Sequence, residues 1–174
     1  MTTTSPVSAD PQKTRDRRPI LLLITALVIL LDRLSKLWIM HHVRPGYGIV
    51  VIPRVFRLTH VLNTGAAFSL FADSLSPVAV RDSLIAFSII AVIIVGALLW
   101  RIGRQLTLTG VALALILGGA IGNLYDRVVY SVVVDFLEVH IIHYHWPDFN
   151  VADSCIVIGA CLLLIEIFRP QSQD

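Results

Sequence analysis

The stretch LTLTGVALALILGGAIGNLY, residues 106–125, runs for 20 residues without a charged side chain. A transmembrane helix takes about 20 predominantly apolar residues, so this stretch is long enough to cross a bilayer. Apolar runs also occupy residues 83–100, 151–168 and 20–31. The last of these lacks a small-residue cleavage site behind it, and apolarity resumes at residues 37–40, so we interpret it as a retained helix and not as a signal peptide. The sequence therefore predicts four transmembrane helices.

The composition of the whole chain agrees with a membrane protein. Over 174 residues, 56% are hydrophobic and 15% are charged, whereas soluble domains carry about 25% charged residues. The basic residues are scattered and form no continuous face, which excludes a nucleic-acid-binding protein. Cys155 and Cys161 lie six residues apart in one apolar run, a spacing that suits neither an intrahelical disulfide nor a metal site.

The domain organisation follows from the positions of these runs. Residues 1–18 are polar and are expected to form a disordered cytoplasmic tail, residues 19–169 a single four-helix membrane domain, and residues 170–174 a second cytoplasmic tail. Four spans place both termini on one side of the membrane. The basic residues before the first helix favour the cytoplasmic side for them, although the remaining basic residues are shared between both sides.

One segment between the first two helices has the composition of β-strands. Residues 48–71 are rich in Val, Ile, Phe and Thr, and Pro and Gly punctuate the segment of about residues 45–72. Open strand edges cannot face lipid, so these strands should rest at the periplasmic interface. The predicted fold is thus an all-α membrane protein, with four transmembrane helices and a small interfacial β-sheet on the periplasmic side.

The polar residues of the apolar segments gather at one predicted membrane face. In a four-helix topology, the second halves of the first and third helices, the long loop and the start of the fourth helix meet there. Ionisable residues inside a membrane are costly and usually mark a functional site. The candidate residues are Asp32, Lys36, Asn63, Gly65, Asn123, Asp126, Arg127, Asp135, Asn150 and Asp153.

Asp135 and Asp153 are the candidate catalytic residues. Asp135 interrupts the apolar stretch Val132–Phe136, and Asp153 lies in the first turn of an apolar helix. Two close, partly desolvated carboxyl groups do not both ionise readily, so one can hold a proton while the other acts as a base. Such a pair can hydrolyse a peptide bond without a metal. Alternatively, Asp153 stabilises the helix dipole and Asp135 forms an ion pair with Arg127.

The other polar residues also have structural interpretations. The three asparagines could orient the acids or hold a substrate backbone, or they could cap helices and turns, above all Asn150. Asp32 and Lys36 have the spacing of a helical ion pair, and Asp126 with Arg127 could anchor a loop. A segment with zinc-ligand residue types is read as a wet interfacial loop, because the chain lacks an H-E-x-x-H string and we expect no catalytic metal or other cofactor. Its polar residues are Glu138, His140, His143, His145 and Asp148.

Five strings, taken in order, resemble the lipoprotein signal peptidase (signal peptidase II) family. They are residues 32–36 (DRLSK), 63–69 (NTGAAFS), 118–127 (GGAIGNLYDR), 133–136 (VVDF) and 149–154 (FNVADS). The resemblance covers about residues 20–168. It implies an aspartic endopeptidase of the bacterial inner membrane, with Asp135 and Asp153 as the catalytic pair and the other candidate residues around them.

The same resemblance implies a substrate and partners. The enzyme would remove the signal peptide of a diacylglyceryl-modified prolipoprotein by cutting before the lipidated cysteine, near the periplasmic face. Membrane lipids are its expected surroundings, and we expect a monomer without nucleic-acid partners. The alternative function is a small four-helix transporter that moves protons or cations with the same acids. The scarcity of charge in the inner halves of the predicted helices argues against a polar path across the membrane.

Overall fold

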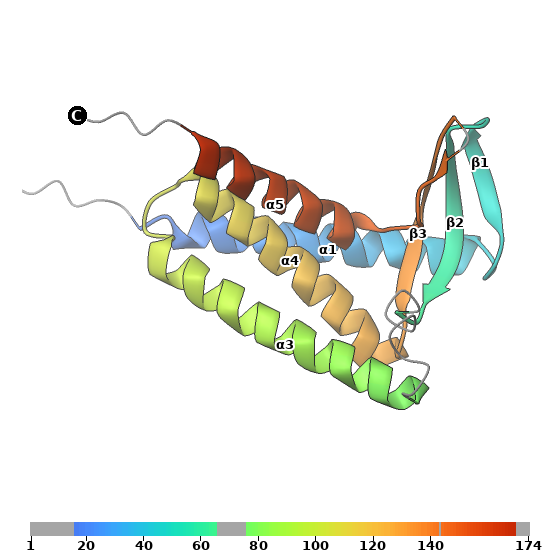
Figure 1. Cartoon of the computed structure of the whole chain (residues 1–174), viewed down its shortest axis with the longest axis horizontal. Helices are drawn as coiled ribbons and strands as arrows, with labels where there is room; N and C mark the ends of the chain where they lie inside the picture. The colour runs from blue at the N-terminus through green and yellow to red at the C-terminus, as the bar shows by residue number, and fades with distance from the viewer. Residues whose placement is uncertain (1–15, 66–75, 143, 170–174) are drawn as a thin grey trace, which may run out of the picture.

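The computed structural model describes residues 16–65, 76–142 and 144–169. Within them, four long helices form a bundle, and an antiparallel sheet lies at one end of it, where α1 and α4 end and α3 and α5 begin (Figure 1). The helices are α1 (Arg18–His42), α3 (Pro77–Ile102), α4 (Leu108–Tyr130) and α5 (Val151–Phe168). The strands are β1 (Gly48–Ile52), β2 (Phe56–Asn63), β3 (Val133–Ile141) and β4 (Tyr144–His145), paired in that order.

The helix limits extend the predicted apolar runs. α5 has the predicted limits, while α3 begins earlier because Pro77 occupies its first turn and the side chain of Ser76 accepts a hydrogen bond from the backbone of Ala79. Among the described residues, α3, α4 and α5 are long and apolar enough to cross a membrane. Three of the four predicted spans are therefore candidate membrane helices by length and composition. α1 continues without interruption through Asp32 and Lys36, whose side chains are buried.

The sheet is larger than predicted. β1 and β2 fall within the predicted segment 45–72, of which residues 66–72 lie outside the described residues, as do residues 1–15 and 170–174 of the predicted tails. The interpretation of residues 138–148 as a loop was wrong for its first part, because Glu138 and His140 belong to β3 and His145 to β4. β3 pairs with β2 along most of its length, which draws this part of the chain into the sheet. His143 is outside the described residues.

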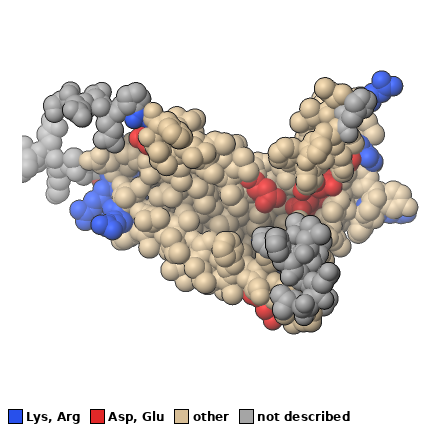
Figure 2. Space-filling model, viewed as in Figure 1, with Lys and Arg blue, Asp and Glu red and all other residues tan. Residues whose placement is uncertain are grey.

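Two apolar clusters hold the fold together. Leu21 of α1 and Leu113 of α4 are buried in a cluster inside the helix bundle. A second cluster joins α1 to the sheet, where Ile39 and Val43 pack against Val134 and Phe136 of β3. The helices also expose many large apolar side chains, as expected of faces that meet lipid. On the face drawn in Figure 2, few charged side chains lie along the middle of the bundle.

Glycines of α4 permit its close contact with α5. A Cβ atom on Gly119 would overlap the backbone carbonyl oxygen of Ala152 and approach Ile156 Cγ1 to 2.8 Å. Small residues allow such backbone approach between membrane helices. Since Ala152 lies in the first turn of α5, this contact positions the end of α5 that carries the polar residues.

We predict that Gly119→Ala destabilises the fold, because the carbonyl of Ala152 belongs to a rigid helix and cannot move aside. Overpacking of this kind costs about 1–3 kcal/mol. Gly96→Ala is the matched control, since the nearest atom to its new Cβ is 3.9 Å away and alanine favours a helix. Thermal unfolding in detergent should show a lower midpoint for Gly119→Ala alone, and equal midpoints for both variants would contradict the packing argument.

Candidate functional site

The first candidate catalytic residue, Asp135, belongs to the sheet and is only 2% exposed. It sits on β3 opposite Val61 of β2. Its Oδ2 accepts a hydrogen bond of 2.8 Å from Asn63 Nδ2, and its Oδ1 accepts one of 2.7 Å from Asn150 Nδ2. The described hydrogen-bond partners of Asp135 are therefore neutral amides. Among the described residues, Asp135 forms no ion pair with Arg127, so that alternative was wrong.

Asp153 occupies the first turn of α5. Asn150 caps this helix, with its Oδ1 accepting from the backbone N–H of Asp153 at 2.9 Å, while Asp153 Oδ2 accepts from the backbone N–H of Asn150 at 3.2 Å. This reciprocal capping box confirms the capping interpretation of Asn150. It also places the Asp153 carboxyl at the N-terminus of α5, where the helix dipole favours negative charge. The other oxygen, Asp153 Oδ1, accepts a hydrogen bond of 2.7 Å from Asn123 Nδ2.

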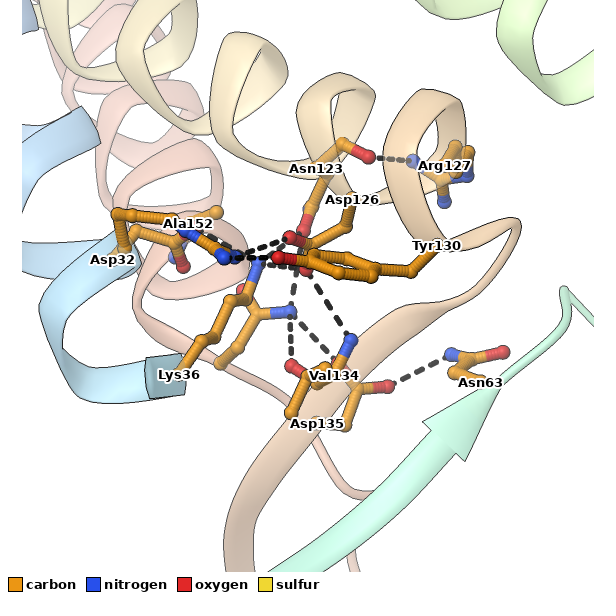
Figure 3. A network of polar contacts seen from close by, with 12 residues as sticks. Asp32, Lys36, Asn63, Asn123, Asp126, Arg127, Tyr130, Val134, Asp135 and Ala152 are labelled. Carbon is orange, nitrogen blue, oxygen red and sulfur yellow. Dashed lines mark hydrogen bonds and ion pairs between the residues drawn. The ribbon is translucent and has the colours of Figure 1, made fainter. Parts of the chain in front are cut away.

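The side chain of Asn150 connects the two acids. It is fully buried, its Nδ2 donates to Asp135 Oδ1, and its Oδ1 binds the backbone of Asp153. The same Nδ2 lies 3.2 Å from Asn123 Oδ1, so the amides of Asn123 and Asn150 form one network with both carboxylates. Polar residues of β2, β3, α4 and the start of α5 thus meet at this point. Figure 3 labels Asn63, Asn123 and Asp135 of this network.

The orientation of Asn63 depends on the turn that follows β2. The backbone N–H of Gly65 donates to Asn63 Oδ1 at 2.8 Å, which leaves Asn63 Nδ2 directed at Asp135. Gly65 has a φ of +83°, and a Cβ there would overlap Leu84 Cδ1. The predicted role of Gly65 in the site is therefore conformational, since side-chain-bearing residues rarely adopt this backbone geometry.

A buried ion triad lies behind the acids. Lys36 is fully buried, and its Nζ lies 2.8 Å from both Asp32 Oδ2 and Asp126 Oδ2. The predicted helical pair is thus confirmed and has a second acid. Lys36 Nζ also donates to Asn123 Oδ1 at 3.2 Å, which connects the triad to the amides around the candidate catalytic pair.

The triad also binds backbone groups that the sequence could not have indicated. Asp32 Oδ1 accepts from the backbone N–H of Ala152 at 2.9 Å, and Asp126 Oδ2 accepts from that of Val134 at 3.3 Å. Asp126 therefore anchors the start of β3, as the loop-anchoring interpretation expected, but its charged partners are Lys36 and Arg33.

The two arginines of the site have different positions. Arg33, which sequence analysis did not select, donates to Asp126 Oδ1 at 3.4 Å and to the hydroxyl of Tyr130. Its guanidinium also lies 4.8 Å from the ring centre of Tyr125. Arg127 donates to the backbone oxygen of Asn123 at 3.3 Å and points away from the triad (Figure 3).

An apolar cavity of about 540 Å³ opens beside Asp153. Its walls come from the segment before α5 and from the first turns of that helix: Trp146, Pro147, Asp148, Phe149, Asp153, Ser154, Val157 and Ile158. Figure 2 shows a hollow between the bundle and the sheet with acidic side chains at its base. A carboxylate at the edge of an apolar cavity can meet a ligand that is mostly apolar.

The pKa of Asp135 differs from that of an ordinary carboxyl group. Burial raises the pKa of Asp135 to about 6, and the charge of Asp153 adds to the increase, while hydrogen bonds from Asn63 and Asn150 oppose it. A neutral Asp135 carboxyl can donate a proton while a neighbouring carboxylate acts as a base. The arrangement can therefore polarise a carbonyl group and deprotonate a water molecule at one place.

We predict that the raised pKa of Asp135 makes stability depend on pH. A carboxyl whose pKa is higher in the folded than in the unfolded protein stabilises the fold fully below its unfolded pKa near 4, and this contribution is lost as the pH rises through about 6. Thermal midpoints between pH 4 and pH 7 should fall more steeply with pH in the wild type than in Asp135→Asn. Parallel curves would show that Asp135 titrates normally.

Comparison with known proteins gives one consistent family. Residues 24–169 match the family model described as signal peptidase (SPase) II. A lipoprotein signal peptidase of Pseudomonas putida is 45% identical over 152 residues, which cover 87% of this chain and 88% of the relative. One of Pseudomonas aeruginosa is 46% identical over 147 residues, covering 84% and 86%.

A solved structure supports the same relationship. It is described as a bacterial membrane enzyme, and it shares 28% sequence identity and a TM-score of 0.80 over 92% of this chain and 100% of its own. The range matched by the family model, residues 24–169, contains the acids, the asparagines and the buried triad. On this evidence, the chain belongs to the signal peptidase II family.

Proposed function

We propose that this chain is a membrane aspartic endopeptidase that cleaves the signal peptide from diacylglyceryl-modified prolipoproteins, just before the lipidated cysteine. The observation that carries the proposal is the single buried amide of Asn150 bound to both Asp135 and Asp153. Family membership supports a peptidase of this substrate class and gives no support to the transporter alternative.

The two acids have different environments, which suggests their roles. Asp135 is the more buried and has the raised pKa, so in our proposal it holds the proton and hydrogen-bonds the scissile carbonyl. Asp153, at the edge of the cavity, takes a proton from water as the water oxygen attacks the carbonyl carbon. The tetrahedral intermediate then breaks its C–N bond, and the proton held by Asp153 passes to the leaving nitrogen.

The amide partners suit this chemistry because they carry no charge. A lysine or arginine beside Asp135 would favour its ionised form. The described side-chain hydrogen-bond partners of both acids are asparagines. Lys36 contacts Asn123 and not the acids, so its charge lowers the pKa of Asp135 less than burial raises it. The network therefore fixes both carboxyl groups and still leaves a proton available to the pair.

We propose that α1 is the fourth transmembrane helix. Its charged residues Asp32 and Lys36 point into the protein, whereas Leu23 and Leu31 are more than half exposed on its outer surface. Intramembrane ion pairs that face the bundle interior are the tolerated kind. With the basic residues before α1 in the cytoplasm, the sheet and the acids would lie at the periplasmic face of the inner membrane.

The first functional prediction concerns the acids. Asp135→Asn and Asp153→Asn should each lower kcat by at least about 10²–10⁴-fold, because an amide preserves the shape but cannot exchange the catalytic proton. Asp82→Asn is the matched control, since Asp82 is an exposed residue of α3 paired with Arg81. Release of signal peptide from a diacylglyceryl-modified precursor, followed by mass spectrometry, measures the effect. Near wild-type turnover in either acid variant would refute the catalytic pair.

The second functional prediction concerns the lipid of the substrate. Both forms of the precursor are held in the membrane by the signal helix, so the diacylglyceryl group should act by placing the scissile bond at the depth of the acids. An unlipidated precursor should be cleaved at least about a hundredfold more slowly, as expected from a displacement of about 1 Å. The two precursors are to be compared at equal density in the same proteoliposomes, and equal rates would show that the lipid is not recognised.

A further inference from the structure

A second cluster of side chains that can bind a ligand lies on the β3–β4 hairpin. Glu138 and His140 are two residues apart on β3, so they share one face of the strand. His145 of β4 is the direct cross-strand partner of His140. The backbone pairing thus places one carboxylate and two imidazoles on the same side of the hairpin.

The three side chains converge on one point. His140 Nε2 lies 2.7 Å and His145 Nε2 3.2 Å from the same atom, Glu138 Oε1. The two imidazole rings stack with their centres 4.9 Å apart, and one ligand atom from each of the three residues lies within 4.8 Å of the others. Glu138 is buried, His140 is partly buried, and His145 is exposed to solvent.

These dimensions are close to those of a metal site. Zinc binds histidine nitrogen and carboxylate oxygen at about 2.0–2.2 Å in tetrahedral geometry, which places neighbouring ligand atoms about 3.3 Å apart. The two nitrogen–oxygen separations in the cluster therefore need only small side-chain rotations to admit an ion. The exposed side of the cluster at His145 leaves a path for entry of the ion and room for a solvent ligand.

We propose that Glu138, His140 and His145 form a binding site for a divalent transition metal, with zinc as the best-matched ion. Two imidazoles and one carboxylate are a ligand set that zinc accepts with a fourth, open position. The site is separate from the peptidase chemistry. Asp135 and Glu138 are an odd number of residues apart on β3, so their side chains leave the strand on opposite faces.

The positive charge of Arg57 lies next to the proposed metal site and affects how strongly it binds a cation. It pairs with Glu138 across the β2–β3 ladder, where its Nη1 donates to Glu138 Oε1 at 3.3 Å and also lies 3.3 Å from Oε2. A metal on Oε1 would take the place of the Arg57 hydrogen bond to that oxygen. Arg57 could keep Oε2, but its positive charge opposes that of the ion. Removal of this charge should therefore tighten metal binding, an effect opposite in sign to the loss of a ligand.

A metal here would fasten the hairpin next to the substrate cavity. The backbone N–H of Trp146, directly after β4, donates to the carbonyl of Val139 at 2.9 Å. Trp146 also lines the apolar cavity beside Asp153. Bound metal would therefore hold the hairpin, and with it one wall of the cavity, without touching the acids.

The test uses the full chain without a histidine tag, purified in detergent and freed of metal by EDTA and dialysis. Zinc chloride titrated in a calorimeter should bind with one equivalent per chain. Glu138→Gln and His145→Ala should each weaken binding at least about 100-fold, since the loss of even an outer partner of a metal ligand costs about 10–100-fold. His41→Ala is the matched control, an exposed histidine at the end of α1, and should bind as the wild type does.

Two further arms make the result decisive. Arg57→Gln should bind zinc more tightly than the wild type, and Co²⁺ in place of zinc should give visible absorption bands that disappear in His140→Ala. Asp135→Asn should bind zinc with unchanged affinity although it no longer cleaves a precursor, which separates this site from the proposed peptidase function. Zinc binding that is absent, or that survives Glu138→Gln and His145→Ala unchanged, would overturn the proposal.

Discussion

The ammonium group of Lys36 between Asp32 and Asp126 is the interaction on which the rest of the structure depends. A buried charge is tolerated only when it is paired and hydrogen-bonded, and here both carboxylates complete their shells with backbone N–H groups of α5 and β3. The triad therefore joins α1, α4, α5 and the sheet through one charge. Removal of one partner from a buried ion pair typically costs about 3–5 kcal/mol, which is a large share of the stability of a small protein.

Hydrogen bonds through two neutral amides connect the triad to Asp135 and Asp153. Lys36 holds the oxygen of Asn123, so the NH₂ group of that amide must point at Asp153. Asn123 and Asn150 share a hydrogen bond, and Asn150 reaches Asp135. One fixed cation thus determines the orientation of two amides and, through them, of two carboxyl groups. The side chain of Asn123 therefore lies between the positive charge of Lys36 and the carboxyl group of Asp153.

The sequence predicted which residues would meet, but not how they would be bonded. Four helices of alternating direction bring their polar ends to one face, and this was enough to group Asp135, Asp153 and the asparagines. The contacts of Asp32 with Ala152 and of Asp126 with Val134 involve backbone groups, which carry no sequence signal. The sequence analysis named Glu138, His140 and His145 but set a metal site aside, because their spacing was compared with a helical zinc motif. Strand alternation and the cross-strand register of β3 and β4 bring the three side chains together.

The strand β3 shows how a small membrane protein can fix an acid without neutralising it. Its first residues are held by Asp126 and by the apolar contact of Val134 with α1, and its far half is paired with β2 through Arg57 and Glu138. Asp135 lies between these two anchors, so its backbone is constrained from both sides. Because the strand supplies the position, the carboxyl group needs no cationic partner. Burial then raises the pKa of Asp135. Burying this carboxyl group is unfavourable, and the contacts of the ordered strand on either side of it supply the compensating stability.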